Sequence, residues 1–319
     1  METKSPSATA KLIATGTFVL AHDKRYSYLI PERAGEVSAM FIEQFSRFGR
    51  LTPGMLKHPS AQLLLQGTIS LVKPYIFLHY ALRKRFIEEQ VRDELARGTD
   101  QVLILGAGFD TLATRLHREF PEVQFLELDS VATQDIKRNV LKMYGLLGPN
   151  LTLRAVDFET PSSLAVLRRA LRLEHRRMLV IAEGLFMYLT EDRVHSILNE
   201  LSSHATAPTS LLFSALTPGP SAKLSRRTSG ALTNLWLQWS GEQFRWAIER
   251  GDLEHFLTER GLSASVVTSP VDLSSRYLGT NFAKVRHKIP KDELFIMSEV
   301  KRFSEAAAST PAKHLGAAA

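Results

Sequence analysis

The feature that most constrains the fold is a pattern that runs without interruption through residues 101–129, QVLILGAGFDTLATRLHREFPEVQFLELD. An apolar run enters a turn that contains Gly106 and Gly108, and a helix-compatible segment follows. Pro121 ends this segment, and a second apolar run then leads to Asp129. The order of strand, glycine turn, helix, strand and acidic residue predicts the first half of a nucleotide-binding α/β domain.

The glycines and the aspartate each have a chemical reason to stand in this pattern. Glycine lets the backbone turn tightly and lets a ligand approach without a Cβ atom in the way. A carboxylate at the end of the second strand accepts hydrogen bonds from both hydroxyls of a ribose, and the interval from Gly106 to Asp129 is close to the roughly 20 residues expected for it. We therefore interpret the pattern as a ligand site rather than as a glycine turn that binds nothing.

The glycine turn favours one class of cofactor over another. The dinucleotide fingerprint G-x-G-x-x-G has a third glycine, and Thr111 stands at that position here. Asp110 places a negative charge where a pyrophosphate would bind and would repel it. S-adenosyl-L-methionine carries an ammonium and a sulfonium but no phosphate, so an acidic turn suits it. The alternative is an NAD(P)-dependent oxidoreductase, for which the chain shows no recognisable Tyr-Lys or His-Asp arrangement.

Apolar runs that alternate with helix-compatible segments predict the rest of the sheet. This alternation is typical of a doubly wound, mostly parallel α/β sheet. No long helix fits between the last two expected strands, so we expect an antiparallel pair at the sheet edge. The expected strands are 102–105, 123–128, 151–156, 178–182, 211–216, 263–268 and 295–300, and the expected helices are 82–98, 130–144, 161–173, 190–201 and 235–260.

We expect three parts along the chain. Residues 1–97 show helical spacing and no alternating strand pattern, which predicts a helical N-terminal cap. Residues 98–303 would form the cofactor-binding sheet domain, with a Pro-, Gly- and Ser-rich loop at 217–230 near the site. The alanine-rich tail, 304–319, is expected to be disordered.

Four successive strand ends carry a glycine or an acidic side chain, and ligands of an open α/β sheet bind at this edge. They are Gly106, Asp129, Asp157 and Glu183. We expect Asp129 to bind the ribose hydroxyls and Asp157 the adenine amino group, with helix capping as the alternative role of Asp157. Glu183 would bind the ammonium of the amino-acid part or a neighbouring arginine. The helix over 82–98 reaches this edge only through its N-terminal part, where Arg83 lies.

Further motifs extend the pattern beyond the glycine turn. They are LGAGFDTLATRL, the ELD of 127–129, the AVDF of 155–158 and the AEGLFMYLTED of 182–192, with LRKRFIEEQ upstream and GEQFRWAIERGDLEHFLTERG downstream. Together they resemble the bacterial branch of the leucine carboxyl methyltransferase family. The resemblance implies a class I S-adenosylmethionine-dependent methyltransferase with a Rossmann-like sheet and a helical N-terminal cap.

The resemblance also implies roles for individual residues. The cofactor would contact Arg83, Gly106, Asp129, Asp157, Phe158 and Glu183, and an acceptor carboxylate would face Arg83 and Tyr188. Departures concern the acceptor side, because Leu112 and Gln243 stand where the family often has Arg and Pro. The N-terminal lysine that some members use has no clear match, and Lys57 and Lys73 are the candidates.

The expected reaction is methyl transfer to the carboxylate or hydroxyl oxygen of a small molecule, with secondary metabolism as one source of the acceptor. A carboxylate is ionised at neutral pH and needs no base, so Arg83 would position it as a bidentate pair. A hydroxyl would need a base, for which Tyr188, His195 and His79 are candidates. The aromatic residues of 236–256 either line an acceptor pocket or, as we favour, pack in the core.

Composition excludes several other classes of protein. The chain has no cysteine, so it has no disulfide and no thiolate metal site, which fits a reducing cytoplasm. Its net charge of +7 comes from scattered Lys and Arg, so we expect no nucleic-acid partner. Polar residues interrupt the apolar region 63–82, which predicts a buried helix and no membrane span. No metal is expected, and a non-catalytic module with this fold is the remaining alternative; the oligomeric state stays open.

Overall fold

The computed structural model describes residues 7–46, 52–58, 60, 75–173, 177–218 and 243–301. Its sheet has seven strands: β1 (Gln101–Leu105), β2 (Gln124–Asp129), β3 (Leu151–Ala155), β4 (Met178–Ala182), β5 (Thr209–Leu216), β6 (Leu262–Thr268) and β7 (Glu293–Val300). Their order is β3-β2-β1-β4-β5-β7-β6. Strands β1 to β5 pair in parallel, and β7 pairs antiparallel with β5 and β6. The predicted fold class is thus confirmed.

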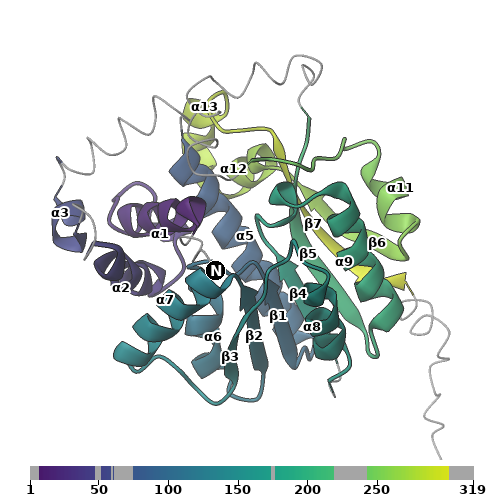
Figure 1. The fold of residues 1–319 in the computed structure, drawn as a ribbon. Coiled ribbons are helices and arrows are strands. Elements are labelled where there is room, and N and C mark those ends of the chain that lie inside the picture. The colour runs from purple at the N-terminus through teal and green to yellow at the C-terminus, as the bar shows by residue number, and fades with distance from the viewer. Residues whose placement is uncertain are drawn as a thin grey trace, which may run out of the picture.

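Helices cover both faces of the sheet (Figure 1). Helices α5, α6, α7 and α12 lie on one side, and α8, α9 and α11 lie on the other. Their bounds are α5 (Ile76–Ala96), α6 (Leu112–Glu119), α7 (Val131–Met143), α8 (Ser162–Leu171), α9 (Glu191–His204), α11 (Leu253–Thr258), α12 (Pro270–Leu278) and α13 (Phe282–Val285). Short 3₁₀ turns are η1 (Ser27–Leu29), η2 (Phe186–Tyr188) and η4 (Gly279–Asn281).

Strand β1 shows why its sequence has no alternation of apolar and polar residues. Val102 and Ile104 join the hydrophobic cluster on one face of the sheet, whereas Leu103 and Leu105 join the cluster on the other. All four side chains are buried. A central strand covered by helices on both faces needs this unbroken apolar run, and its carboxyl end leads into the glycine turn.

The N-terminal segment forms helices, as its spacing predicts. They are α1 (Ala8–Ala21), α2 (Ala34–Ser46) and α3 (Pro53–Lys57). Helix α1 packs against α2 and α5, and α2 lies beside α7 (Figure 1). Gly16 of α1 permits a close approach to α5, because a Cβ atom there would lie 2.6 Å from the Phe77 ring. Ser7 caps α1 by accepting a hydrogen bond from Ala10 N–H (3.0 Å).

Helix α5 connects this helical layer to the sheet. It begins at Ile76, earlier than expected, and Gly98, with a φ of +91°, follows its end and leads into β1. Phe86, Val91 and Leu95 are all buried, as the helical spacing predicts. The N-terminal half of α5 therefore lies where its side chains reach the carboxyl edge of the sheet.

The helix expected over 235–260 is wrong for most of its described part. Residues 243–250 contain no helix, and α11 begins only at Leu253. Arg245 N–H donates to Met187 O at 2.7 Å, and Ile248 N–H donates to Leu216 O at 2.8 Å. Because these backbone donors bond to distant segments, they cannot close helical turns. Residues 235–242 lie outside the described residues.

The antiparallel pairing of the last two strands is confirmed, but their connection is longer than a simple hairpin. It contains α12, whose nine residues begin with a capping box between Ser269 and Asp272. This Ser-x-x-Asp spacing is a helix start signal that the prediction passed over. Strand β7 inserts next to β5, which leaves β6 at the edge.

Some predictions concern segments that the structure does not describe. These are the tail 304–319, the first part of the apolar region 63–82 and most of the loop 217–230. Among the described segments, no helix combines the length and the apolar character that a membrane span requires.

Candidate active site

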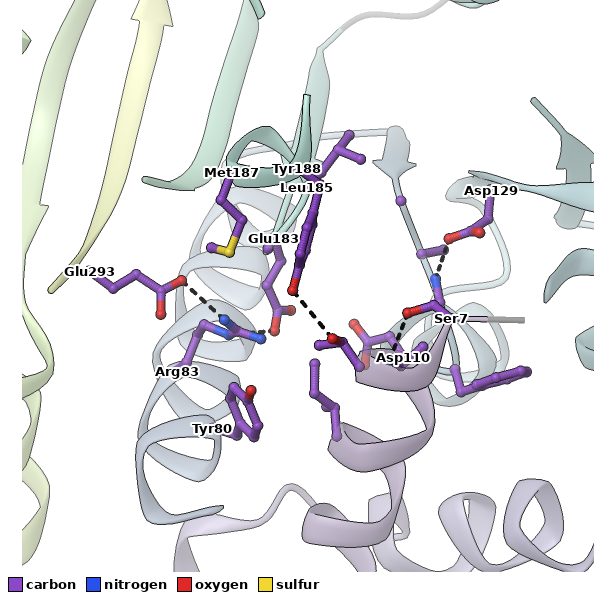
Figure 2. Close-up of a pocket in the computed structure, with 18 of the residues that line it drawn as sticks. Ser7, Tyr80, Arg83, Asp110, Asp129, Glu183, Leu185, Met187, Tyr188 and Glu293 are labelled. Carbon is purple, nitrogen blue, oxygen red and sulfur yellow. Dashed lines mark hydrogen bonds and ion pairs between the residues drawn. The ribbon is translucent and has the colours of Figure 1, made fainter. Parts of the chain in front are cut away.

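A cavity of about 660 Å³ opens at the carboxyl edge of the central strands. This volume lies within the range of roughly 300–1,000 Å³ that is typical of small-molecule sites. The glycine turn after β1, the end of β2 and the loop after β4 contribute to its lining, and so do α5 and the first residues of α1 (Figure 2). The sequence predicted this edge, and the contribution of α1 is a finding of the structure.

The glycine turn is held by backbone hydrogen bonds to the neighbouring strand. Gly106 N–H and Ala107 N–H donate to Leu128 O at 2.8 and 3.2 Å. Gly106 and Gly108 have φ values of +69° and +50°, a region that favours glycine. A Cβ atom at Gly106 would lie 3.0 Å from the side chain of Leu185, so a larger residue would also crowd this side chain.

Asp129 lies at the end of β2 and lines the cavity, as predicted. Gly108 N–H donates to its Oδ2 at 2.7 Å, and Ser130 N–H donates to its Oδ1 at 2.6 Å. These two bonds fix the carboxylate, and each oxygen keeps a further lone pair with which to accept a hydrogen bond. The arrangement fits the ribose role that the sequence predicts.

Arg83 reaches the cavity from α5 and is only 3% exposed. Its Nε donates to Glu183 Oε1 at 2.8 Å, and its Nη1 donates to Glu293 Oε1 at 3.0 Å. Figure 2 shows the guanidinium between these two carboxylates, and it lies over the Tyr80 ring, 4.9 Å from the centroid. Although burial opposes it, the two carboxylates raise the pKa of Arg83, which keeps it charged.

Lys84, the next residue of α5, connects the glycine turn to the end of β4. Its Nζ lies 3.1 Å from Asp110 Oδ2 and 2.8 Å from Glu183 Oε2. Burial favours a neutral Asp110, but the cations Lys84, Lys137 and Arg115 lower the pKa of Asp110 to about 2. The negative charges of Asp110 and Glu183, which appear unpaired in the sequence, are therefore offset by residues distant in the chain.

Asp157 and Phe158 lie near this edge but do not line the cavity. Asp157 is exposed, and its Oδ1 accepts a hydrogen bond from Glu159 N–H at 3.0 Å. Phe158 is 7% exposed and packs in the hydrophobic core. The alternative role of Asp157 as a helix cap is wrong, because Pro161 occupies the N-cap position of α8. Contact of either residue with the cofactor stays a prediction.

Tyr188 lines the cavity opposite the start of α1. Its hydroxyl, marked by a dashed line in Figure 2, lies 3.4 Å from Thr9 Oγ1. Its ring centroid lies 5.5 Å from that of Phe244. Phe244 also lines the cavity, whereas Trp246 packs in the core against Phe186. The described members of the predicted aromatic group are thus divided between pocket and core, and residues 236–242 lie outside the described residues.

Of the two histidines considered as bases, only His79 lines the cavity. Its Nε2 lies 2.6 Å from Glu293 Oε2, and no partner for its buried Nδ1 is present among the described residues. His195 lies against Arg260, away from the cavity. Lys57 does not line the cavity either, and Lys73 lies outside the described residues.

Glu293 is the main site residue that the sequence prediction missed. It begins β7, which runs opposite to its neighbours, so the start of this strand meets the carboxyl ends of the others. Although burial raises its pKa, Arg83 and His79 lower the pKa of Glu293 to about 2. An acidic residue directly before an apolar strand was the available signal. Across the described segments, no group of three or more His, Asp or Glu side chains is arranged to hold a metal ion.

Comparison with known proteins identifies the family to which this chain belongs. A model of the leucine carboxyl methyltransferase family matches residues 21–202, which is more than half of the 319-residue chain. A Mycobacterium ulcerans protein named "Putative S-adenosyl-L-methionine-dependent methyltransferase" is 26% identical over 276 residues, covering 83% of this chain and 85% of that protein. The similarly named YktD of Bacillus subtilis is 27% identical, covering 61% of this chain and 64% of YktD.

The fold has a counterpart among solved structures. The crystal structure described as a putative methyltransferase from Thermobifida fusca has a TM-score of 0.53 and 13% identity, and the match covers 94% of this chain and 97% of that one. The cavity, the two positive-φ glycines and the fixed Asp129 carboxylate fit an adenosyl cofactor. The resemblance and the cofactor predicted from the sequence are thereby confirmed. The chain belongs to the leucine carboxyl methyltransferase family of S-adenosylmethionine-dependent methyltransferases.

Proposed function

We propose that this protein is an O-methyltransferase that methylates an oxygen of a small-molecule acceptor. The observation that carries the proposal is the meeting, in one cavity, of the glycine turn and Asp129 with the buried Arg83 network. The first part suits an adenosyl cofactor, and the second supplies fixed charges beside the space that remains. A cytoplasmic location and the absence of a nucleic-acid partner stay predictions of the sequence.

The chain's own residues would hold the cofactor as follows. Asp129 accepts hydrogen bonds from the ribose hydroxyls, and the glycine turn lets the backbone approach the ligand closely. Glu183, although paired with Arg83 and Lys84, keeps lone pairs for an ammonium group. When bound, S-adenosylmethionine supplies an electrophilic methyl group on its sulfonium. Position and exclusion of water, rather than acid–base chemistry, are then the main contributions of the protein.

The hydrogen bonds that the Arg83 guanidinium already makes affect which acceptor it can bind. Two of its donors already bond to Glu183 and Glu293, so a carboxylate acceptor must share them or displace a carboxylate. A single interaction through the remaining donors is compatible with this arrangement, but the bidentate pair expected from the sequence is not available without such a displacement. The geometry therefore gives a hydroxyl acceptor more support than the sequence did.

A hydroxyl acceptor needs a base, and His79 fits that role. The tautomer in which Nε2 of His79 donates to Glu293 leaves a lone pair on Nδ1. A histidine whose one nitrogen is fixed by a carboxylate and whose other is unpaired is the arrangement of a general base. In this second form of the proposal, His79 takes the hydroxyl proton, and Glu293 stabilises the resulting imidazolium.

Calorimetric titration tests the cofactor part of the proposal. We expect S-adenosylmethionine and S-adenosylhomocysteine to bind with micromolar dissociation constants, and NADH not to bind. Asp129→Ala should abolish the adenosyl binding. Binding of NADH alone would instead support the oxidoreductase, and no binding of any of the three would support a non-catalytic module.

A product analysis distinguishes the two acceptor classes. The enzyme is incubated with radiolabelled S-adenosylmethionine and separate pools of small carboxylic acids and of phenols. A methyl ester is hydrolysed by mild alkali and a methyl ether is not. If the acceptor is a hydroxyl, His79→Asn should lower its turnover by about 10²–10⁴-fold, whereas transfer to a carboxylate should change little.

A further inference from the structure

A fully buried ion pair lies beneath the glycine turn, outside the cavity. Lys137 of α7 and Glu127 of β2 have side chains that are both 0% exposed, and Lys137 Nζ lies 2.7 Å from Glu127 Oε2. Apart from this ion pair, no hydrogen-bond partner for the Glu127 carboxylate is present among the described residues. Neither residue lines the cavity, so any effect on a ligand must pass through another group.

That group is Asp110, the last residue of the glycine turn. Lys137 Nζ donates to Asp110 O at 2.7 Å, and the side chain of Asp110 lines the cavity and pairs with Lys84. Lys84 in turn contacts Glu183. Lys137 therefore fixes the backbone at the point where the turn meets the charged network of the site.

Stability alone does not explain why a charged pair is buried here. Replacing a buried ion pair by apolar residues of similar volume is often neutral or stabilising. Burial raises the pKa of Glu127 to about 7 in spite of Lys137, which shows how costly this location is for a carboxylate. An apolar pair could fill the same space, but it could not donate a hydrogen bond to the Asp110 carbonyl.

We propose that Lys137, paired with Glu127, is a positioning residue for the cofactor, because it holds the glycine turn in its binding conformation through Asp110 O. The inference rests on the proposed function, since it concerns the same cofactor site. It assigns to β2 and α7 a contribution to cofactor affinity that requires no contact with the cofactor.

The test measures S-adenosylhomocysteine binding by calorimetry and the unfolding temperature of the ligand-free protein by calorimetric scanning. The first variant is Lys137→Met, which keeps the length of the side chain and removes its charge and donor. We expect the dissociation constant to rise at least tenfold. Because this variant leaves Glu127 buried without a partner, its unfolding temperature should also fall.

A double variant separates positioning from stability. In Glu127→Leu/Lys137→Met both charges are absent, so the unfolding temperature should return close to that of the wild type. The dissociation constant should remain at least fivefold higher than in the wild type, because Asp110 O still lacks its donor. Recovery of both quantities in the double variant would mean that the pair is only structural and would overturn the proposal.

Arg177→Met provides the matched control. Arg177 pairs with the buried Glu94 just before β4, at the opposite end of the strand from the cavity. This variant should lower the unfolding temperature and leave the dissociation constant unchanged. If the wild type itself binds no S-adenosylhomocysteine, the proposed function fails. If the wild type binds and Lys137→Met binds equally well, only the positioning role fails.

Discussion

The two sides of the cavity are built in different ways. On the cofactor side, the glycine turn and Asp129 come from one continuous stretch, and backbone N–H groups fix them. On the other side, the acceptor side, which would face the acceptor and also the ammonium of the cofactor, Arg83, Glu183 and Glu293 come from three distant segments, and buried ion pairs connect them. The residues of the first side are close together in the sequence, whereas those of the second side come together only when the sheet has assembled.

This difference has an energetic consequence. Backbone hydrogen bonds of a turn largely survive the loss of one side chain, because the neighbouring strand still provides the acceptors. A buried ion network responds in another way, since removing one partner leaves an uncompensated charge in the protein interior. We therefore expect substitutions on the cofactor side to change affinity, and substitutions in the Arg83 network to change stability as well.

The largest effect is expected for Arg83→Met. The change leaves Glu183 and Glu293 facing each other's charge without their shared cation, with only Lys84 and His79 beside them. Breaking a buried pair in this way costs about 3–5 kcal/mol of unfolding free energy. Denaturant unfolding followed by circular dichroism measures it.

Arg85→Met is the control for this prediction. Arg85 also lies on α5 but forms a partly exposed pair with Glu89, with side chains 44% and 24% exposed, and pairs near the surface contribute about 0.2–1 kcal/mol. If the two arginine variants lose similar stability, the view of the acceptor side as a buried charge network is wrong.

We also expect the unfolding free energy to fall at acid pH because of Glu293. The pKa of Glu293 is lowered from its ordinary 4.5 to about 2 by Arg83, His79 and Ser214, which outweigh the effect of burial. Because the folded-state value is the lower one, this stabilisation is present above pH 4.5 and is lost as the pH falls toward 2. It amounts to about 3 kcal/mol.

Unfolding free energies measured between pH 6 and pH 2.5 check this prediction. The wild type should lose stability through that window, and Glu293→Gln, although less stable at pH 6, should show a flatter profile. Parallel profiles for the two proteins would mean that Glu293 is not ionised by its neighbours in the fold.

On the cofactor side, we expect a substitution of Asp129 to lower cofactor affinity more than stability. Asp129→Asn keeps the size of the side chain and one acceptor oxygen. It removes the negative charge and one of the two oxygens that accept hydrogen bonds from Gly108 N–H and Ser130 N–H. Charge-assisted hydrogen bonds contribute about 1.5–3 kcal/mol, so S-adenosylhomocysteine affinity should fall by about 10–100-fold. The unfolding free energy should change by less than in Arg83→Met. A loss of stability as large as that of Arg83→Met would contradict the contrast between the two sides.

The same contrast explains what the sequence could predict. The sheet, the glycine turn, Asp129 and Arg83 were all predicted, because each belongs to a local pattern or to a motif of the family. Glu293 was missed because its place depends on the direction of β7, and direction is decided by pairing with β5 rather than by neighbouring residues. The pairing of Lys84 with Asp110 and Glu183 was missed because it joins segments that are distant in the sequence.

The segment over 243–250 shows most clearly what the sequence could not predict. Its aromatic spacing predicted a helix, yet its backbone donors bond to Met187 O and Leu216 O instead. Tertiary contacts decide such a segment, and a single sequence contains no signal for them. Phe244 consequently faces the cavity, whereas Trp246, two residues later, faces the core.

The smallest effect is expected for Tyr188→Phe, which tests whether the loop after β4 belongs to the acceptor side. The variant removes only the hydroxyl that lies 3.4 Å from Thr9 Oγ1 and keeps the ring beside Phe244. A hydrogen bond of this kind contributes about 0.5–1.5 kcal/mol, so stability should fall by no more than that, and S-adenosylhomocysteine affinity should change less than threefold. If Tyr188 positions the acceptor, turnover should fall more than cofactor affinity. If turnover and S-adenosylhomocysteine affinity instead fall by the same factor, Tyr188 acts on the cofactor and not on the acceptor.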